Sequence, residues 1–328
     1  MAEAQWQPAD PKVTAQNRNQ AAMLANKVTR RYRHMRKRFA RQNIEVFRLY
    51  DWDIPEIRAV VDWYAGHLVI GEYTRTQSTP EWLPLMGAAV AEALGVPRDK
   101  LHLKERRAGF QGGKRYQRLD FTNQKIIVSE RDFRFYVNPF DYIDTGLFAD
   151  HRDTRQMVRG VAAGKDFLNL YCYTGTFSCY AARGGARSTV SVDRAESAIQ
   201  WTRENMALNA IPAAGNSLVQ AHALDFLKMA QRRHRTFDLA VVDPPSYSTT
   251  RERQDDFDIL RDHPLLLAAV VAVMRPGATI WFSTNHQNFI PCMDQLPVAD
   301  VTEITAATIP EDYRSKRKTI HRCWKITL

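Results

Sequence analysis

The stretch that decides the fold is Phe167-Leu-Asn-Leu-Tyr-Cys-Tyr-Thr-Gly-Thr-Phe177. Its first residues are typical of a buried strand, Thr174-Gly175 predicts a turn, and the segment from Phe177 to Arg183 is compatible with a helix. A strand that passes through a glycine turn into a helix presents backbone N–H groups and a shallow crevice to a nucleotide-like ligand. We therefore expect a cofactor to bind at this turn.

Strand-like and helix-like segments alternate beyond this stretch. The predicted strands cover residues 166–171, 187–193, 216–222, 237–243 and 278–284, and the helices between them end near residues 183, 209, 231 and 274. Two later strands are expected at residues 301–308 and 323–328. The alternation predicts an α/β domain over residues 146–328, with a mostly parallel, doubly wound, Rossmann-like sheet.

The preceding segment, residues 44–145, has a different texture. Short runs of β-branched and aromatic residues at 45–50, 58–64, 67–73, 101–106, 125–130 and 133–137 predict strands, and residues 80–94 predict one helix. Strands followed by a helix and more strands do not make a βαβ series. We expect a small α+β domain here, serving to bind RNA.

The first 43 residues are strongly basic. They contain ten Lys or Arg and two acidic residues, within a chain of net charge +10, and residues 15–41 predict a helix. Such a helix suits a polyanion, although a solvated face or a membrane-surface helix has the same pattern. The candidate RNA-binding residues are Lys27, Arg30, Arg31, Arg33, Arg36, Lys37 and Arg38 in this arm, with Lys114 and Arg115 in a later glycine-containing loop.

The composition is not that of a membrane, secreted, disulfide-rich or metal-binding protein. The apolar fraction of 45% and the charged fraction of 25% are those of a globular protein. No signal peptide or membrane-length apolar run is evident, so we expect a cytoplasmic protein. The four cysteines form no C-x-x-C pair, which predicts neither a metal site nor a disulfide framework. We expect His151, His286 and His321 to be surface groups or groups that support the site from behind.

Two acidic residues follow predicted strands. Asp193 ends the second strand, 18 residues after Gly175, where a ribose diol needs an acceptor. Asp225 follows the third strand and could accept a hydrogen bond from an adenine amino group. For both, the alternative is an ordinary helix N-cap.

The number of glycines in the turn indicates which class of cofactor fits. Dinucleotide sites use G-x-G-x-x-G, whereas this turn offers one glycine, so a pyrophosphate is disfavoured and S-adenosylmethionine (SAM) fits better. Asp243-Pro-Pro-Ser-Tyr247 follows the fourth strand. Its prolines remove two N–H donors and leave carbonyls that can hold the donor-bearing edge of a base, and Tyr247 can stack on the face of that base.

These motifs carry a family resemblance. Asn169 to Gly175, Asp243 to Tyr247, Asp144-Thr-Gly-Leu-Phe-Ala-Asp-His-Arg152 and Gly184-Gly-Ala-Arg187 resemble the class I SAM-dependent rRNA methyltransferases. More narrowly, residues 26–328 resemble the RlmK family of 23S rRNA guanine-N7 methyltransferases, which some bacteria carry as the C-terminal half of a fused protein. The fused guanine-N2 methyltransferase has no counterpart here, so a separate enzyme of that kind is a possible partner.

The resemblance implies roles for individual residues. The cofactor-binding set comprises Phe148, Asp150, Arg152, Asn169, Tyr171, Tyr173, Thr174, Gly175, Asp193, Arg194, Asp225, Phe226 and Asp243. Within it, Arg152 suits the methionine carboxylate of SAM. The catalytic set comprises Asp243, Pro244, Pro245, Ser246, Tyr247 and Asn285. The implied substrate is 23S rRNA or a pre-50S ribosomal particle.

Two alternatives remain beside guanine-N7 methylation. A 23S rRNA cytosine-C5 methyltransferase needs a cysteine thiolate near the catalytic loop, where this chain has Ser246 and no cysteine. A non-catalytic protein that binds SAM and RNA is the other, and the intact residues at the expected SAM positions argue against it. Guanine N7 has an available lone pair and needs no general base, only positioning in line with the sulfonium methyl.

Overall fold

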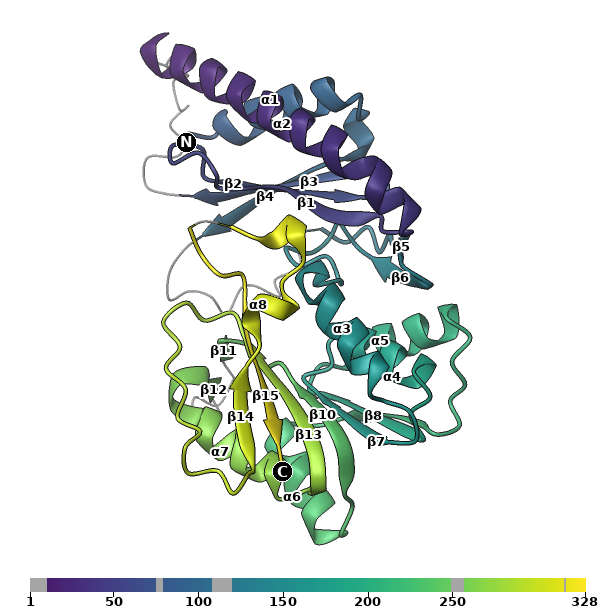
Figure 1. Cartoon of the computed structure of the whole chain (residues 1–328). Coiled ribbons are helices and arrows are strands. Elements are labelled where there is room, and N and C mark those ends of the chain that lie inside the picture. The colour runs from purple at the N-terminus through teal and green to yellow at the C-terminus, as the bar shows by residue number, and fades with distance from the viewer. Residues whose placement is uncertain (1–10, 75–78, 108–119, 249–256, 316) are drawn as a thin grey trace, which may run out of the picture. The chain divides into compact units, whose positions relative to one another are not determined.

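The computed structural model describes residues 11–74, 79–107, 120–248, 257–315 and 317–328 (Figure 1). The chain forms two compact units, Met1–Gln111 and Gly112–Leu328. The sequence had suggested divisions after residues 43 and 145 instead. Both differences have a physical cause in how side chains pack within each unit.

The N-terminal unit is a four-stranded sheet with two helices. Its strands are β1 (Val46–Asp51), β2 (Ala59–Tyr64), β3 (His67–Thr74) and β4 (Leu101–Arg107), and its helices are α1 (Pro11–Arg41) and α2 (Trp82–Leu94). The strand order is β1-β2-β3-β4, antiparallel except for the parallel pair β3–β4. A one-turn 3-10 helix, Arg98–Lys100, precedes β4. The predicted strands and helix of this region are present.

Helix α1 belongs to the core of this unit. Leu24, Val28, Met35 and Phe39 recur at helical spacing and are at most 5% exposed. The helix packs against α2, where Trp82 Nε1 donates to Gln20 Oε1 at 2.6 Å. A long apolar stripe needs a partner surface, which is why residues 11–41 do not form a separate arm. None of the helices in the described part of the chain is long and apolar enough to cross a membrane.

The C-terminal unit contains the predicted Rossmann-like sheet. Five strands are parallel, and β15 lies antiparallel between β13 and β14. The order is β14-β15-β13-β10-β7-β8-β9. The strands are β7 (Asp166–Leu170), β8 (Ser188–Asp193), β9 (Asn216–Gln220), β10 (Phe237–Val242), β13 (Met274–Thr284), β14 (Asp300–Glu303) and β15 (Arg322–Thr327).

Helices cover both faces of this sheet (Figure 1). They are α3 (Arg152–Gly160), α4 (Thr176–Arg183), α5 (Glu196–Leu208), α6 (Ala223–Arg232) and α7 (Ile259–Val271). Side chains from α6 and α7 pack on one face with Leu168 and Leu170, whereas side chains from α3 and α4 pack with Phe167. The central strands are therefore buried on both sides, as expected of a parallel sheet.

Some predicted boundaries were wrong. The expected strand at residues 301–308 ends at Glu303, and Thr305–Thr308 form a short helix, α8. Helix α7 begins at Ile259 because the Asp258 carboxylate accepts from Leu260 N at 2.9 Å as its N-cap. It ends at Val271, since strand β13 already begins at Met274.

The hairpin of β5 (Ile126–Glu130) and β6 (Phe133–Val137) is part of the C-terminal unit and is joined to its helices by buried side chains. Arg155 of α3 makes a bidentate pair with Glu130, at 2.9 and 2.7 Å, and the Tyr180 hydroxyl of α4 donates to the same carboxylate. Arg155 and Glu130 are each 1% exposed. This buried pair explains why the unit begins before the hairpin and not after residue 145.

Candidate active site

The turn after β7 has the strained backbone that a close approach to a ligand requires. Tyr171, Tyr173 and Gly175 have φ angles of +57°, +50° and +74°. A Cβ atom on Gly175 would lie 2.2 Å from Thr202 Cγ2 of α5. Gly175 is therefore required twice, by its left-handed conformation and by the helix packed against it.

Side chains from distant segments hold this turn in place. Thr174 Oγ1 donates to the Gly146 carbonyl at 2.6 Å, and Asn205 Nδ2 of α5 donates to the Thr174 carbonyl at 2.9 Å. Thr202 Oγ1 donates to the Tyr173 carbonyl at 3.0 Å. The turn is thus fixed from two directions before any ligand binds.

Asp193 lies at the carboxyl end of β8, next to this turn. Its Oδ2 accepts from Tyr173 N at 3.0 Å, and its Oδ1 accepts from Ala195 N at 2.9 Å. The N-cap of α5 is Ala195, so the alternative of Asp193 as the cap is wrong. Burial raises the pKa of Asp193, and the two N–H donors oppose that effect. Each oxygen has a second lone pair with which it can accept from a ribose hydroxyl.

Two aromatic residues border the turn. The Tyr171 hydroxyl is buried and has no hydrogen-bond partner among the described residues, and burial raises its pKa. The Phe148 ring is 39% exposed and lies 5.3 Å from the Tyr173 ring, with the Phe148 carbonyl held by Arg155. An orphaned hydroxyl and an exposed ring are groups that a bound ligand would satisfy and cover.

The catalytic-loop candidates meet at the ends of neighbouring strands. Asp243 follows β10, and its Oδ1 accepts from Ser283 Oγ of β13 at 2.6 Å. The Ser246 hydroxyl bonds to the Asn285 side chain, which follows β13. The sequence placed Asp243, Ser246 and Asn285 in one site, and the structure brings them together.

The two prolines keep their carbonyls available. Among the described residues no donor bonds to the Pro244 or Pro245 carbonyl, whereas the Ser246 carbonyl accepts from Ile259 N at 3.1 Å. Tyr247 is half-buried in a two-residue strand, β11 (Tyr247–Ser248), paired with β12 (Phe257–Asp258). The loop therefore offers acceptors of the kind a base edge needs.

Arg152 is held by a carboxylate of this chain. It is 2% exposed, and its guanidinium donates to Asp312 at 2.5 Å, with Asp312 1% exposed. A cofactor carboxylate at Arg152 would share the guanidinium with Asp312.

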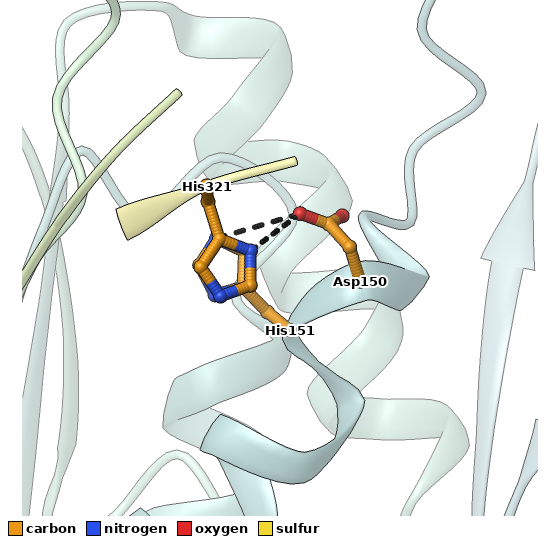
Figure 2. A group of neighbouring side chains, drawn as sticks. All are labelled: Asp150, His151 and His321. Atoms are coloured by element: carbon orange, nitrogen blue, oxygen red, sulfur yellow. Dashed lines mark hydrogen bonds and ion pairs between the residues drawn. The ribbon is translucent and has the colours of Figure 1, made fainter. Parts of the chain in front are cut away.

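Two histidines, His151 and His321, stack on one another (Figure 2), and His151 Nε2 lies 3.6 Å from Asp243 Oδ2. The His151 and His321 rings are 4.1 Å apart with an interplanar angle of 12°. His321 Nδ1 bonds to Asp150 Oδ2 at 2.9 Å and His321 Nε2 to Thr308 Oγ1 at 3.0 Å. Both histidines are at most 4% exposed, which excludes the surface position and leaves the other expectation, that they support the site from behind. The sequence carried no periodic signal for this pair.

Asp150, His151 and His321 place ligand atoms within 4.8 Å of one another, a spacing open to a metal ion. Nearly parallel rings, however, direct their in-plane lone pairs side by side and not to one point (Figure 2). Hydrogen bonding to Asp150 and Thr308 accounts for His321 without an ion.

Comparison with known proteins decides the family. Residues 119–295 match the S-adenosylmethionine-dependent methyltransferase family model. Ribosomal RNA large subunit methyltransferase K of Neisseria meningitidis is 37% identical over 92% of this chain and 86% of its own length. The chain belongs to the S-adenosylmethionine-dependent methyltransferases.

Other relatives agree. Ribosomal RNA large subunit methyltransferase K/L of Psychromonas ingrahamii is 36% identical over 94% of this chain, which spans only 41% of that relative. A methyltransferase solved with S-adenosylhomocysteine has the same fold, with 22% identity and a TM-score of 0.75 over 95% of this chain and 82% of its own.

The site fits the cofactor of this methyltransferase. The strained turn, the Asp193 carboxylate, the Tyr171 hydroxyl and the Phe148 ring are the groups that would hold SAM. When bound, SAM supplies an electrophilic methyl group. Arg194 is exposed next to Asp193.

Three further cofactor candidates of the methyltransferase lie in β7 and α6, outside the turn itself. Asn169 is buried and donates to Ser178 Oγ at 2.9 Å, tying β7 to α4. Phe226 is 1% exposed and packs in the core. Asp225 is exposed, 3.8 Å from Lys228, and the N-cap of α6 is His222, so the alternative of Asp225 as the cap was wrong. Strand β9 ends at Gln220, two residues earlier than predicted, which shifts Asp225 into the helix.

The cysteines of the methyltransferase are poorly suited to nucleophilic catalysis. Cys172, Cys179 and Cys323 are buried, and burial raises the pKa of all three thiols, that of Cys179 to about 12. Cys292 is exposed but lies in the segment after β13, outside the catalytic loop. A thiolate attack on a base is therefore disfavoured.

The candidate RNA-binding residues of α1 divide into two groups. Arg30, Arg33, Arg36 and Lys37 are exposed. The others face the protein: Lys27 and Arg31 approach Asp53 at 3.3 and 3.8 Å, and Arg38 lies over the Phe39 ring at 5.6 Å. The remaining candidates, Lys114 and Arg115, lie outside the described residues.

Proposed function

We propose that this methyltransferase transfers the methyl group of SAM to guanine N7 of 23S rRNA. The observation that carries the proposal is the catalytic loop, in which a fixed carboxylate, Asp243, and two available proline carbonyls stand where no thiolate is present. The family resemblance, and the name of the Neisseria relative as a ribosomal RNA large subunit methyltransferase, support rRNA as the substrate.

The reaction needs no proton transfer. The N7 lone pair forms a bond to the methyl carbon as the carbon–sulfur bond breaks, and its electron pair stays on sulfur in S-adenosylhomocysteine. Asp243 and the carbonyls of Pro244 and Pro245 accept from the guanine N1–H and amino group, while Tyr247 stacks and Asn285 adds a contact. The product base is cationic, so the Asp243 carboxylate stabilises charge as it develops.

The substrate must also be opened. N7 lies in the major groove, which is deep and narrow in A-form RNA, so a paired guanine has to leave the helix. Arg30, Arg33 and Lys37 are exposed and follow one another at i, i+3 and i+7, which makes a cationic stripe along α1. In this proposal the N-terminal unit grips the phosphates of flanking RNA.

The wider setting belongs to the same proposal. The substrate is 23S rRNA, free or in a pre-50S particle in the cytoplasm. The chain spans less than half of the K/L relatives. A separate guanine-N2 methyltransferase is a partner in this proposal.

Mapping of rRNA modifications tests the proposal. In cells lacking this protein, mass spectrometry of 23S rRNA nucleosides should show the loss of one N7-methylguanosine, restored by the intact gene and not by Asp243→Ala. Loss of a C5-methylcytidine in its place would establish the cytosine alternative. SAM binding without any lost modification would indicate a non-catalytic protein.

A further inference from the structure

The two oxygens of Asp243 have different neighbours. Oδ1 accepts from Ser283 at 2.6 Å, whereas Oδ2 lies 3.6 Å from His151 Nε2. That distance is longer than a hydrogen bond, but bonds in a catalytic site without substrate are often long and tighten when the substrate binds. His151 is therefore the group placed to fix the second oxygen of Asp243.

His151 is itself held from behind. Its ring stacks on His321, which bonds to Asp150 (Figure 2). Thr308 also bonds to His321, and the Phe177 ring lies edge-on to His151 with 5.7 Å between the ring centroids. His321 and Asp150 are separated by 171 positions, so the support for His151 comes from segments that are distant in the sequence. The ring cannot rotate without breaking this stack.

The charge of this group matters for the carboxylate beside it. Burial, and then the neighbouring His321, lower the pKa of His151 to about 4, so the imidazole is neutral near pH 7. A neutral N–H donor orients a carboxylate without cancelling its charge. A lysine or arginine at the same place would offset the negative charge that a cationic methylated base requires.

We propose that His151 is a positioning residue that sets the orientation of Asp243 while leaving its charge intact. The inference rests on the proposed function to the extent that Asp243 faces the target base. It assigns the stacked pair to catalysis and not to metal binding or to folding alone.

Four single variants test the proposal in the full chain, with SAM and 23S rRNA as substrates. His151→Ala should lower kcat about 100-fold, which is the effect expected of a small misplacement of the Asp243 carboxylate. Its SAM affinity and Tm should be close to those of the buried control variant described below. His151→Gln, whose amide nitrogen can reach the Nε2 position, should restore most of the rate. His151→Lys should stay as slow as His151→Ala, because its charge offsets Asp243.

The buried control is His263→Ala. His263 is fully buried in the same unit, bonds to the Ile259 carbonyl and to Cys292 N, and has no contact with Asp243. It should lower Tm while kcat stays within about twofold of the intact protein. An equal loss of kcat in both alanine variants, or an unchanged kcat in His151→Ala or His151→Lys, would overturn the inference.

A double variant separates this inference from the proposed function. If His151 acts through Asp243, His151→Ala should cost nothing further in an Asp243→Asn background, whereas additive losses would contradict it. Nucleoside mass spectrometry of the same reactions identifies the methylated atom. A product other than N7-methylguanosine would overturn the proposed function while the non-additive cycle still supported the role of His151.

Discussion

Helix α1 and the carboxyl edge of the seven-stranded sheet carry their polar groups in opposite ways. Along α1, Arg30, Arg33, Arg36 and Lys37 are exposed to solvent, while an apolar stripe on the same helix packs into the core. At the sheet edge, polar side chains such as Arg152, His151 and His321 are buried and each depends on another. Each substitution on the α1 surface should therefore reduce RNA binding by a small step, whereas a single substitution at the sheet edge should greatly reduce activity or stability.

The largest effect is expected at Asp243. Replacement by alanine removes the carboxylate that stabilises developing charge, and should lower kcat about 100- to 1,000-fold. SAM affinity, measured by titration calorimetry, should fall much less than kcat, because Asp193 and the turn after β7 remain. Intact turnover in Asp243→Ala would mean that this loop does not hold the target base.

Buried and exposed ion pairs on α3 offer the next test. Glu130→Ala leaves Arg155 buried without its carboxylate and should cost about 3–5 kcal/mol of unfolding free energy, measured in urea. The matched control, Asp132→Ala, breaks an exposed pair with Arg159 on the same helix and should cost about 1 kcal/mol or less. Equal losses of unfolding free energy in the two variants would contradict the distinction between buried and exposed charged groups.

The stripe on α1 should respond gradually. Changing Arg30, Arg33 and Lys37 together to glutamine should weaken RNA binding and reduce the slope of log affinity against log salt by about 2–3, as three phosphate contacts are lost. In the control triple, the exposed residues Arg203, Arg232 and Arg233 are changed to glutamine, which removes the same amount of positive charge. If both triples behave alike, net charge and not the stripe governs binding. Substitution is preferable to deletion, because α1 forms part of the core.

The smallest effect concerns acid stability. His67 Nδ1 and His102 Nε2 lie 3.0 Å apart between β3 and β4. Burial, then His67 and Lys104, lower the pKa of His102 to about 4 from its ordinary 6.5. Below pH 6.5 the unfolded chain binds more protons, so unfolding free energy should fall as pH drops from about 6.5 to about 4. His102→Gln should flatten that decline in urea titrations, and an unaltered slope would refute the role of the pair.

The comparison also explains what could be predicted from the sequence. Periodic features could be predicted: the strand and helix alternation, the Gly175 turn and Asp193 at a strand end follow from local spacing. The helix of residues 15–41 was also predicted, but its packing into the core was not. The Arg152–Asp312 pair and the stacked histidines were not, because their partners lie 160 and more positions away and nothing local marks them. Strand β9 ends two residues earlier than predicted, and Asp225 lies in the first turn of α6.

The most direct test of the central claim is an in vitro reaction with methyl-labelled SAM and unmodified 23S rRNA, followed by nucleoside mass spectrometry. We expect label on N7 of a single guanosine with the intact protein, and label that appears about 100- to 1,000-fold more slowly with Asp243→Ala at equal SAM occupancy. Label on a cytosine carbon, or label that appears at an undiminished rate without the Asp243 carboxylate, would contradict this claim.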